Sequence, residues 1–338
     1  MKNKQSNVLF TVGVVLLVMT ALIGLLFVNG NVNDEGAANA ITRGNEQTVY
    51  NMLLLGKDSA AGLCDVMILV SIDTGSGNVA IIQIPRDTYF NYTDGSYKKI
   101  NGALSALGSE QFASKLGNAL GTKIDYYLCV DYDVVEQMVD MLSGVEIDVP
   151  MDMSYSDPAQ NLTINLGAGK QMLNGRECIQ FLRYRSGYVT GDLGRMDAQK
   201  LFLNAFVKRM CEKKNPSVFI NLFNIIKNKG STNIREQDLI LIGLKCAKTK
   251  GGEVSYLTAP GEAIQSSKSG AWYYVLSKES MIEILNKHLA VPDACENFDK
   301  EEKFVDKNIK SFYDIYNKRC EYKIYSASDI ENNEININ

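Results

Sequence analysis

The sequence predicts a layered α/β domain, with α-β-α layers around a central mixed sheet, preceded by one N-terminal transmembrane helix. Strand-like apolar runs alternate along the chain with segments of helical periodicity, which is the pattern of an α/β fold. One long uncharged apolar run lies close to the N-terminus. The 338 residues, 46% of them hydrophobic, have a globular composition and can form one large or two modest domains.

The apolar run Val8–Val28 is the predicted transmembrane helix. Its length matches the roughly 20 apolar residues that a helix needs to cross a bilayer. Lys2 and Lys4 precede the run, whereas Asp34 and Glu35 follow it. Positively charged flanks stay in the cytoplasm. We therefore expect a single-pass anchor in the cell membrane, with the N-terminus inside the cell and the rest of the chain outside it. A cleaved signal peptide is the alternative, although its apolar core usually has only about 7–15 residues.

The composition of the rest of the chain indicates where one segment ends and the next begins. The segment after the apolar run is rich in Asn, Gly and Ala, which is typical of a flexible tether. The predicted organisation is a cytoplasmic tail (1–7), a transmembrane signal anchor (8–28), a tether (29–47), an extracellular domain (48–290) and a tail that is first helical and then disordered (291–338).

Apolar runs rich in Val and Ile predict the first strands of the sheet, over Val49–Leu55, Val66–Ile72 and Val79–Ile84. Asp73–Asn78 has the turn chemistry of a hairpin between the second and third of these. Val145–Val149 alternates apolar and acidic residues and predicts a half-exposed strand. Further strands are predicted at Tyr126–Val130, Trp272–Leu276 and Leu182–Arg185.

Helical spacing of apolar residues predicts the helices. Ser109 is the expected N-cap of a helix that ends at Leu120, Asp131 caps the next one, and Asn174 starts a short one. Further helices are predicted at Arg195–Lys213, Val218–Ile226, Gln237–Ala247 and Ser280–His288. In the tail, one helical stripe of Val305, Ile309, Phe312 and Tyr316 is expected to pack on its own domain, and the polar Asp329–Asn338 to be disordered.

The cysteine pattern argues against a zinc site. The seven cysteines show no Cys-x-x-Cys spacing, and the single histidine cannot form a cluster with them. Cys129 and Cys246 have apolar neighbours in the sequence and are expected to be buried thiols. Cys295 and Cys320 in the tail have the option of a disulfide bridge, which the sequence does not decide.

An arginine-rich stretch, Gln180–Lys200, is the strongest functional signal within the chain. If the stretch is extended at Arg183 and Arg185, these two side chains face the same side. Arg195 and Gln199 align only on a helix, because they are four residues apart. A glycine-rich loop between the two pairs would bring three guanidinium groups and an amide together, which suits a phosphate or pyrophosphate. The alternative is that these arginines are ordinary surface cations.

A second cluster lies upstream, where Asp58, Asp65, Arg86 and Asp87 stand at the ends of consecutive predicted strands. Strand ends are the usual place for a site in an α/β sheet. Two carboxylates near arginines suit Mg²⁺, which favours one or two protein carboxylates together with substrate phosphate oxygens. The alternative for Asp87 is a turn residue, because it follows Pro85 and Arg86.

In their order, these motifs resemble the LytR–CpsA–Psr family of envelope glycopolymer ligases. Seven segments match at the family's spacing from about Val49 to Lys213, and the signal anchor fits the family as well. Each motif is weak alone, whereas seven in order are specific. The matching segments are Leu53–Asp58, Cys64–Ser71, Ile84–Tyr89, Lys99–Asn101, Gly144–Pro150, Phe181–Arg185 and Asp192–Arg195.

The resemblance implies roles for individual residues. It makes Asp58, Asp65 and Arg86 catalytic, Asp58 and Asp65 ligands of Mg²⁺ (or Mn²⁺), and Arg183, Arg185, Arg195 and Gln199 the pyrophosphate-binding residues. As an alternative role, one of the two acids would accept a proton from an attacking hydroxyl, and we expect this acid to be Asp58.

Three positions depart from the family pattern. Leu63 stands where an Arg is common, Cys64 where Ser or another small residue is common, and Ala198 where a second Arg often precedes the Gln. The loss of two cations weakens the predicted anion site.

The implied function is transfer of a glycosyl phosphate, from a teichoic acid, capsule or other secondary wall polymer, to a hydroxyl of peptidoglycan. The donor would be linked to polyprenyl pyrophosphate, with the lipid tail in an apolar cleft and membrane lipid as a further partner. The alternatives are a polyprenyl-pyrophosphate hydrolase and a non-catalytic envelope regulator or wall-binding module. The near-neutral charge of −4 and the predicted outside location argue against a nucleic-acid partner. His288 lies outside the matched region and is expected to be structural or exposed.

Overall fold

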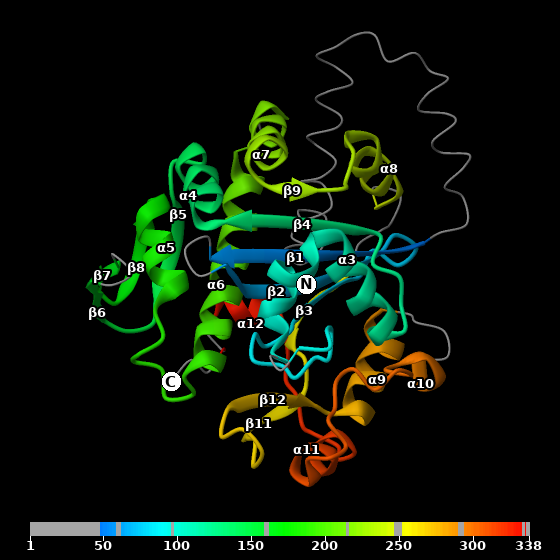
Figure 1. The fold of residues 1–338 in the computed structure, drawn as a ribbon. Helices are drawn as coiled ribbons and strands as arrows, with labels where there is room; N and C mark the ends of the chain where they lie inside the picture. Colours follow the sequence, from blue (N-terminus) through cyan, green and yellow to red (C-terminus); the bar gives the residue numbers. More distant parts are fainter. Residues whose placement is uncertain are drawn as a thin grey trace.

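The computed structural model describes residues 48–58, 62–95, 98–158, 162–213, 216–246, 252–289, 294–332 and 335. Within these residues a seven-stranded mixed sheet forms the centre of the domain (Figure 1), in the order β13-β10-β3-β2-β1-β4-β9. Its strands are β1 (Val49–Asp58), β2 (Leu63–Asp73), β3 (Val79–Gln83), β4 (Tyr126–Asp131), β9 (Ser231–Thr232), β10 (Val254–Thr258) and β13 (Ile324–Ser326).

The strand pairing confirms the predicted mixed sheet. β1 pairs in parallel with β4, and β3 with β10, whereas the other neighbours are antiparallel. The predicted hairpin joins β2 to β3, and the N–H of Asp73 donates to the carbonyl of Asn78 at 2.9 Å. In the β1–β2 pair the register shifts at Gly56, where a Cβ would lie 2.8 Å from the Cβ of Val66. Only glycine permits this close approach of the two strands.

Two hydrophobic cores cover the two faces of the sheet, as the period of two along the strands requires. Leu53 and Leu55 of β1 point into the first core, and Tyr50 and Leu54 point into the second. On the first face pack η1 (Ile100–Gly102), α3 (Ala103–Leu120), the β11 (Gly261–Gln265) and β12 (Trp272–Leu276) hairpin, α9 (Lys278–His288), α10 (Ala294–Asn297) and α11 (Lys310–Tyr316).

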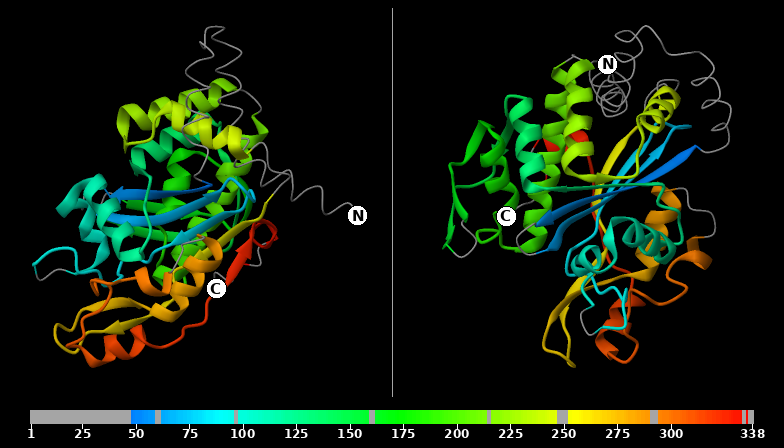
Figure 2. Two further views of the ribbon diagram at one scale, coloured as in Figure 1. Left: turned by 90° about the vertical axis from the view of Figure 1, so that its right-hand side faces the viewer. Right: turned by 45° about the horizontal axis from the view of Figure 1, so that its top comes forward.

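Among the described residues, the second face carries six helices, of which α5 and α6 include parts of the arginine-rich stretch. They are α4 (Tyr132–Met141), α5 (Gly175–Arg183), α6 (Asp192–Glu212), α7 (Pro216–Lys229), α8 (Glu236–Cys246) and α12 (Ala327–Glu331). Two small sheets flank them, of β5 (Val145–Val149) with β8 (Gly169–Leu173) and of β6 (Met153–Asp157) with β7 (Leu162–Leu166). Figure 2 shows this group on one side and β11–α11 grouped on another. The α-β-α layering is confirmed.

The prediction of an extended Leu182–Arg185 is wrong. Helix α5 continues through Arg183, and only Tyr184 and Arg185 leave it. The helix persists because Cys178 and Phe181 form a buried face at helical spacing, and because Asn174 closes a capping box at its start. Likewise α6 begins at Asp192, before the predicted Arg195.

Other predicted elements are confirmed with shifted boundaries. Asp131 caps α4 by accepting from the N–H of Val134 at 3.0 Å. Helix α3 starts at Ala103, upstream of the predicted cap Ser109, but it is interrupted next to that residue by Gly108 at φ 75°. Alternating burial along β5 matches the predicted half-exposed strand.

The C-terminal segment belongs to the core. Val305, Ile309, Phe312 and Tyr316 are all buried in the first core, as expected, although only the last two lie in a helix. Asp299 holds this segment together, since its carboxylate accepts from the hydroxyl of Tyr316 at 2.7 Å.

One prediction for the tail is wrong. Residues 329–331, which we expected to be disordered, belong to α12, because Ile330 is buried in the second core; residues 333, 334 and 336–338 lie outside the described residues. Cys320 is a free buried thiol, and the side chain of Cys295, its optional partner, is not among the described side chains. Cys129 and Cys246 are buried free thiols, as predicted.

In the part of the chain that the structure describes, no helix combines the length and apolarity needed to cross a bilayer. The predicted cytoplasmic tail, signal anchor and tether (1–47) lie outside that part.

If the tail is part of the core, Phe312→Ala should lower the free energy of unfolding by about 3–5 kcal/mol, because it removes a fully buried ring. Its neighbour Tyr313, which is 46% exposed, provides the matched control, and Tyr313→Ala should cost about 1 kcal/mol or less. Urea unfolding of both variants measures the difference. Equal losses would show that the tail does not pack as described.

Candidate functional site

A polar pocket of about 270 Å³ opens at the C-terminal end of β1. Eight separate elements or loops contribute charged or aromatic side chains to it. It is lined by Asp58 at the end of β1, Asp65 in β2, Arg86 after β3, Tyr132 at the start of α4, Arg183 at the end of α5, Arg185 and Ser186 after it, Arg195 in α6, Tyr155 in β6 and Leu162 in β7.

The pairing of the strands places the two carboxylates side by side. Asp58 is opposite Leu63 in the β1–β2 register, so Asp65 stands two residues along the neighbouring strand. Arg86 follows β3, which pairs with β2 on its other side. The predicted convergence of the strand-end cluster with the arginine-rich stretch is therefore observed for Asp58, Asp65, Arg86, and for the three downstream arginines as well.

Arg183 and Arg185 reach the same pocket by a different route from the predicted strand. Arg183 is the last residue of α5, and the extended Tyr184 (φ −64°, ψ 136°) turns the chain so that Arg185 also faces the pocket. The loop then returns to α6 through Gly191, whose φ of 60° is a conformation that glycine adopts without strain.

A network of ion pairs ties the arginines to the acids. Arg86 Nη1 lies 2.6 Å from Asp65 Oδ1, and Arg86 Nη2 lies 3.3 Å from Asp192 Oδ1. The same oxygen of Asp192 is 2.8 Å from Arg195 Nη2. Arg183 Nη2 is 4.0 Å from Asp58 Oδ2. Arg185 is exposed and makes no ion pair with a described residue.

Several guanidinium nitrogens in this network have no hydrogen-bond acceptor among the described residues. They are Arg86 Nε and both Nε and Nη2 of Arg195, whose contact with Asp192 lacks hydrogen-bond geometry. Arg195 is only 4% exposed, so water does not readily serve these donors. A buried unsatisfied donor costs about 1–3 kcal/mol, and more when it is charged. The positive charge of these guanidinium groups, which line the pocket, would favour an oxyanion there.

The protonation states favour anion binding. Burial opposes the charge of Arg86, but the neighbouring Asp192 and Asp65 outweigh it and raise the pKa of this guanidinium. Burial, followed by the charge of Asp65, raises the pKa of Tyr132, so its phenol stays protonated. The Tyr132 hydroxyl therefore donates to Asp65 Oδ2, at 3.3 Å.

Gln199 is the one predicted site residue that the structure does not bring to this pocket. It is on the same face of α6 as Arg195, as predicted, but one turn deeper, which is about 5.4 Å along a helix. There its Oε1 accepts from Gln83 Nε2 at 3.2 Å, and its side chain lines an apolar cavity instead.

This apolar cavity has a volume of about 250 Å³ and lies between the sheet and helices α4 and α6. Aliphatic and aromatic side chains from both layers form its wall. They include Leu54, Leu55, Val66, Ile68, Leu128, Val130, Tyr132, Val135, Met138, Leu182, Phe202, Leu203 and Phe206. An apolar cavity beside a cationic pocket fits a ligand with a charged head and a hydrocarbon tail.

The two carboxylates of the pocket fit a magnesium ion only with help from a ligand. Nowhere among the described residues do three His, Cys, Asp or Glu side chains gather closely enough to hold a metal ion. Mg²⁺ commonly takes one or two protein carboxylates and completes its shell with water and substrate phosphates. Asp58 and Asp65 would supply the protein's share, with Asp65 already oriented by Arg86 and Tyr132.

Two residues that contact the pocket residues were not predicted from the sequence as parts of the site. Asp192, which bridges Arg86 and Arg195, precedes Arg195 by three residues, and this spacing at a helix start was a usable signal. Tyr132 follows the cap Asp131, and nothing in its spacing indicates the pocket.

Asp87, the fourth residue of the predicted strand-end cluster, lies outside the pocket, since its carboxylate pairs with Lys99 at 2.7 Å. His288 is also outside the pocket and half-buried.

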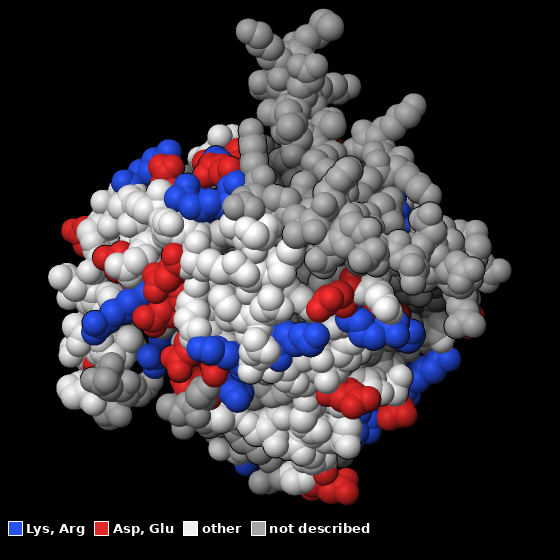
Figure 3. Space-filling view, turned by 90° about the horizontal axis from the view of Figure 1, so that it is seen from above, with Lys and Arg blue, Asp and Glu red and all other residues white. Residues whose placement is uncertain are grey.

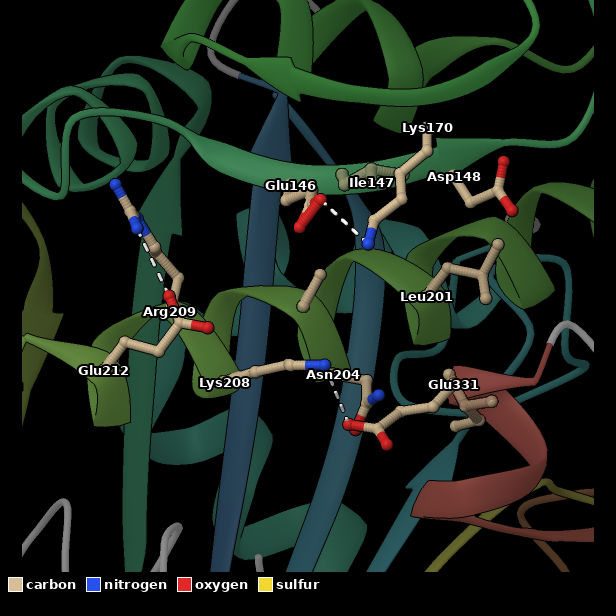
Figure 4. A pocket seen from close by; sticks show the side chains of 12 residues that line it. Glu146, Ile147, Asp148, Lys170, Leu201, Asn204, Lys208, Arg209, Glu212 and Glu331 are labelled. Atoms are coloured by element: carbon tan, nitrogen blue, oxygen red, sulfur yellow. Dashed lines mark hydrogen bonds and ion pairs between the residues drawn. The ribbon is translucent and has the colours of Figure 1, made fainter.

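A second groove, between β5–β8 and α6, has the opposite character (Figure 4). Its charged side chains neutralise one another in pairs: Lys170 with Glu146 at 3.0 Å, Lys208 with Glu331 at 3.3 Å, and Arg209 with Glu212 at 3.2 Å. On the face in Figure 3, basic and acidic side chains are likewise interspersed. The arginine pocket differs from this groove, because its arginines carry buried N–H groups without hydrogen-bond acceptors among the described residues.

Comparison with known proteins finds relatives over most of the chain. TagV of Bacillus subtilis (strain 168), named a polyisoprenyl-teichoic acid–peptidoglycan teichoic acid transferase, is 29% identical over 302 residues, which cover 81% of this chain and 76% of TagV. The crystal structure of B. subtilis TagV matches with a TM-score of 0.60 at 27% identity, covering 72% of this chain and 98% of that one.

A more distant structure shares the fold. It is the LytR-CPS2A-psr family protein YwtF (TagT) with bound octaprenyl pyrophosphate lipid, with a TM-score of 0.54, 20% identity, and coverage of 72% of this chain and 90% of that one. The model of the LytR_cpsA_psr family matches residues 28–289, which include every residue of the arginine pocket. The chain belongs to the LytR_cpsA_psr family.

Proposed function

We propose that this protein transfers a glycosyl phosphate from a polyprenyl pyrophosphate-linked glycopolymer to a hydroxyl of peptidoglycan, with Mg²⁺ (or Mn²⁺) as cofactor. The polymer would be a teichoic acid, a capsule or another secondary wall polymer. One observation carries the proposal: four arginines converge on a pocket that adjoins an apolar cavity. A pyrophosphate with a prenyl tail fits both. The name of the relative TagV supports the same reaction class.

In this proposal the pyrophosphate lies under the arginines. The N–H groups of Arg86 and Arg195 donate to its oxygens, and Arg183 and Arg185 add charge from the other rim. These fixed donors stabilise the negative charge that grows on the transferred phosphoryl group and on the leaving polyprenyl phosphate. The apolar cavity holds the start of the lipid tail, and Gln199 lies along this tail rather than on the phosphate.

Asp58 and Asp65 provide the proton acceptor and the ligands of the metal ion. The acceptor oxygen forms a bond to the transferred phosphorus while the bond from that phosphorus to the bridging oxygen breaks. Asp58, which is 9% exposed, accepts the proton of the acceptor hydroxyl. Asp58 and Asp65 would hold the divalent cation, which would supply further charge stabilisation. Asp65 is anchored by Arg86 at 2.6 Å, so its orientation does not depend on the ligand.

The location follows from the predicted anchor. A lipid-linked donor and a peptidoglycan acceptor meet at the outer face of the cell membrane. A domain tethered there by a single-pass signal anchor over residues 8–28, with the N-terminus in the cytoplasm, would reach both.

Removing the charge of Asp65 or the planar fork of Arg183 tests the reaction. Asp65→Asn and Arg183→Lys should each cut turnover by about 10²–10³, because each removes a group aimed at developing charge. The measurement is Mg²⁺-dependent release of polyprenyl phosphate and covalent attachment of polymer to peptidoglycan, with circular dichroism to confirm folding.

Lys123→Ala is the control, because Lys123 is 81% exposed on its side chain and distant from the pocket in the fold. Full activity of folded Asp65→Asn and Arg183→Lys would rule out this site. Release of lipid phosphate at the same rate without peptidoglycan, and no attached polymer, would identify a hydrolase instead.

Tail length tests the apolar cavity. The domain should bind octaprenyl phosphate more tightly than geranyl phosphate, since burial contributes roughly 0.8 kcal/mol per CH₂. Leu203→Gln, which places an amide in the cavity wall, should reduce this preference, whereas Leu193→Gln at a 38% exposed position should preserve it. Isothermal titration measures both affinities. Equal affinity of the native domain for both lipids would exclude a tail site.

A further inference from the structure

Tyr132 lies between the arginine pocket and the apolar cavity. Among the described residues, it alone lines both the arginine pocket and the apolar cavity. It is the first residue of α4, directly after the cap Asp131, so the helix start fixes its backbone. Its side chain is half-buried at the boundary where a charged head group would meet its hydrocarbon tail.

The polar end of Tyr132 contacts the acid that we place at the reacting phosphate. Its hydroxyl donates to Asp65 Oδ2 at 3.3 Å, while the other oxygen of Asp65 accepts from Arg86 at 2.6 Å. The carboxylate is therefore held at both oxygens, by a neutral donor on one side and a cation on the other. Loss of the phenol would free Asp65 to rotate about its contact with Arg86.

The ring of Tyr132 contacts a different charged group. The guanidinium carbon of Arg183 lies over it, 5.2 Å from the ring centroid, which is cation–π distance. Arg183 is at the end of α5, where its Nη2 lies 4.0 Å from Asp58 Oδ2. The ring thus packs against the guanidinium group of Arg183.

We propose that Tyr132 is a positioning residue that couples the head-group pocket to the lipid cavity and sets where the phosphate–lipid junction lies. This inference rests on the proposed function. It assigns separate tasks to two parts of one side chain. The hydroxyl orients Asp65 for the reaction, and the ring holds Arg183 and closes the mouth of the cavity around the first isoprene units.

Two substitutions separate these tasks. Tyr132→Phe keeps the ring and removes the hydroxyl, so turnover should fall about tenfold or more while octaprenyl phosphate binds as before. Tyr132→Leu removes the ring as well, so affinity for octaprenyl phosphate should also fall, by about tenfold. Binding is measured by calorimetry in the presence of a chelator, which keeps it independent of a metal ion. Tyr313→Phe and Tyr313→Leu, at an exposed tyrosine of α11, are the matched controls.

A double-mutant cycle distinguishes positioning from a general structural role. If Tyr132 acts through Asp65, Tyr132→Phe should have little further effect on turnover in the Asp65→Asn background. Additive losses in the cycle would overturn the inference, as would unchanged turnover of Tyr132→Phe or equal binding losses in Tyr132→Phe and Tyr132→Leu. A native protein that neither transfers polymer nor binds octaprenyl phosphate would overturn the proposed function too, whereas an active one with insensitive Tyr132 variants overturns this inference alone.

Discussion

The site depends on one carboxylate that contacts two cations. Asp192 at the start of α6 contacts Arg86 at 3.3 Å and Arg195 at 2.8 Å through the same oxygen. Asp65 adds a second contact to Arg86 at 2.6 Å, but Arg183 and Arg185 bring further positive charge to the same pocket. The surrounding elements hold this arrangement in place: β1, β2 and the segment after β3 fix the acids and Arg86, and α6 fixes Arg195. A pocket with more arginines than carboxylates suits an anion.

The two layers of helices have different consequences for function. The first core, with the hairpin and the C-terminal helices, closes one face of the sheet with aromatic side chains. On the second face, α4 and α6 leave a cavity against β1, β2 and β4. Because the strands carry apolar side chains on both faces, the same sheet that stabilises the fold also provides the wall of the apolar cavity. Tyr132 stands where this wall meets the charged pocket.

Sequence patterns predicted β1, β2, β3 and β4 of the sheet and the charged residues of the pocket, but not β9, β10 and β13 or the geometry of the pocket. Strands such as β1 and β5 were recognisable because burial alternates with a period that the sequence displays. The prediction that Arg183 and Arg185 lie on a strand was wrong. The two side chains of an Arg-x-Arg pair face the same side on a strand, but they also do so where a helix ends between them, and the sequence does not distinguish the two cases. Gln199 was misplaced because the same helical face passes from a polar to an apolar cavity within one turn. Tyr132 could not be predicted, since its role arises from contacts with β2 and α5, which are distant in sequence.

A crystal structure of the domain with a bound prenyl pyrophosphate tests the central claim most directly. The account predicts phosphate oxygens within hydrogen-bond distance of the guanidinium groups of Arg86 and Arg195, with the tail between β1 and α4. It would be contradicted by a pyrophosphate that binds outside the arginine pocket, or by a tail that lies outside the apolar cavity.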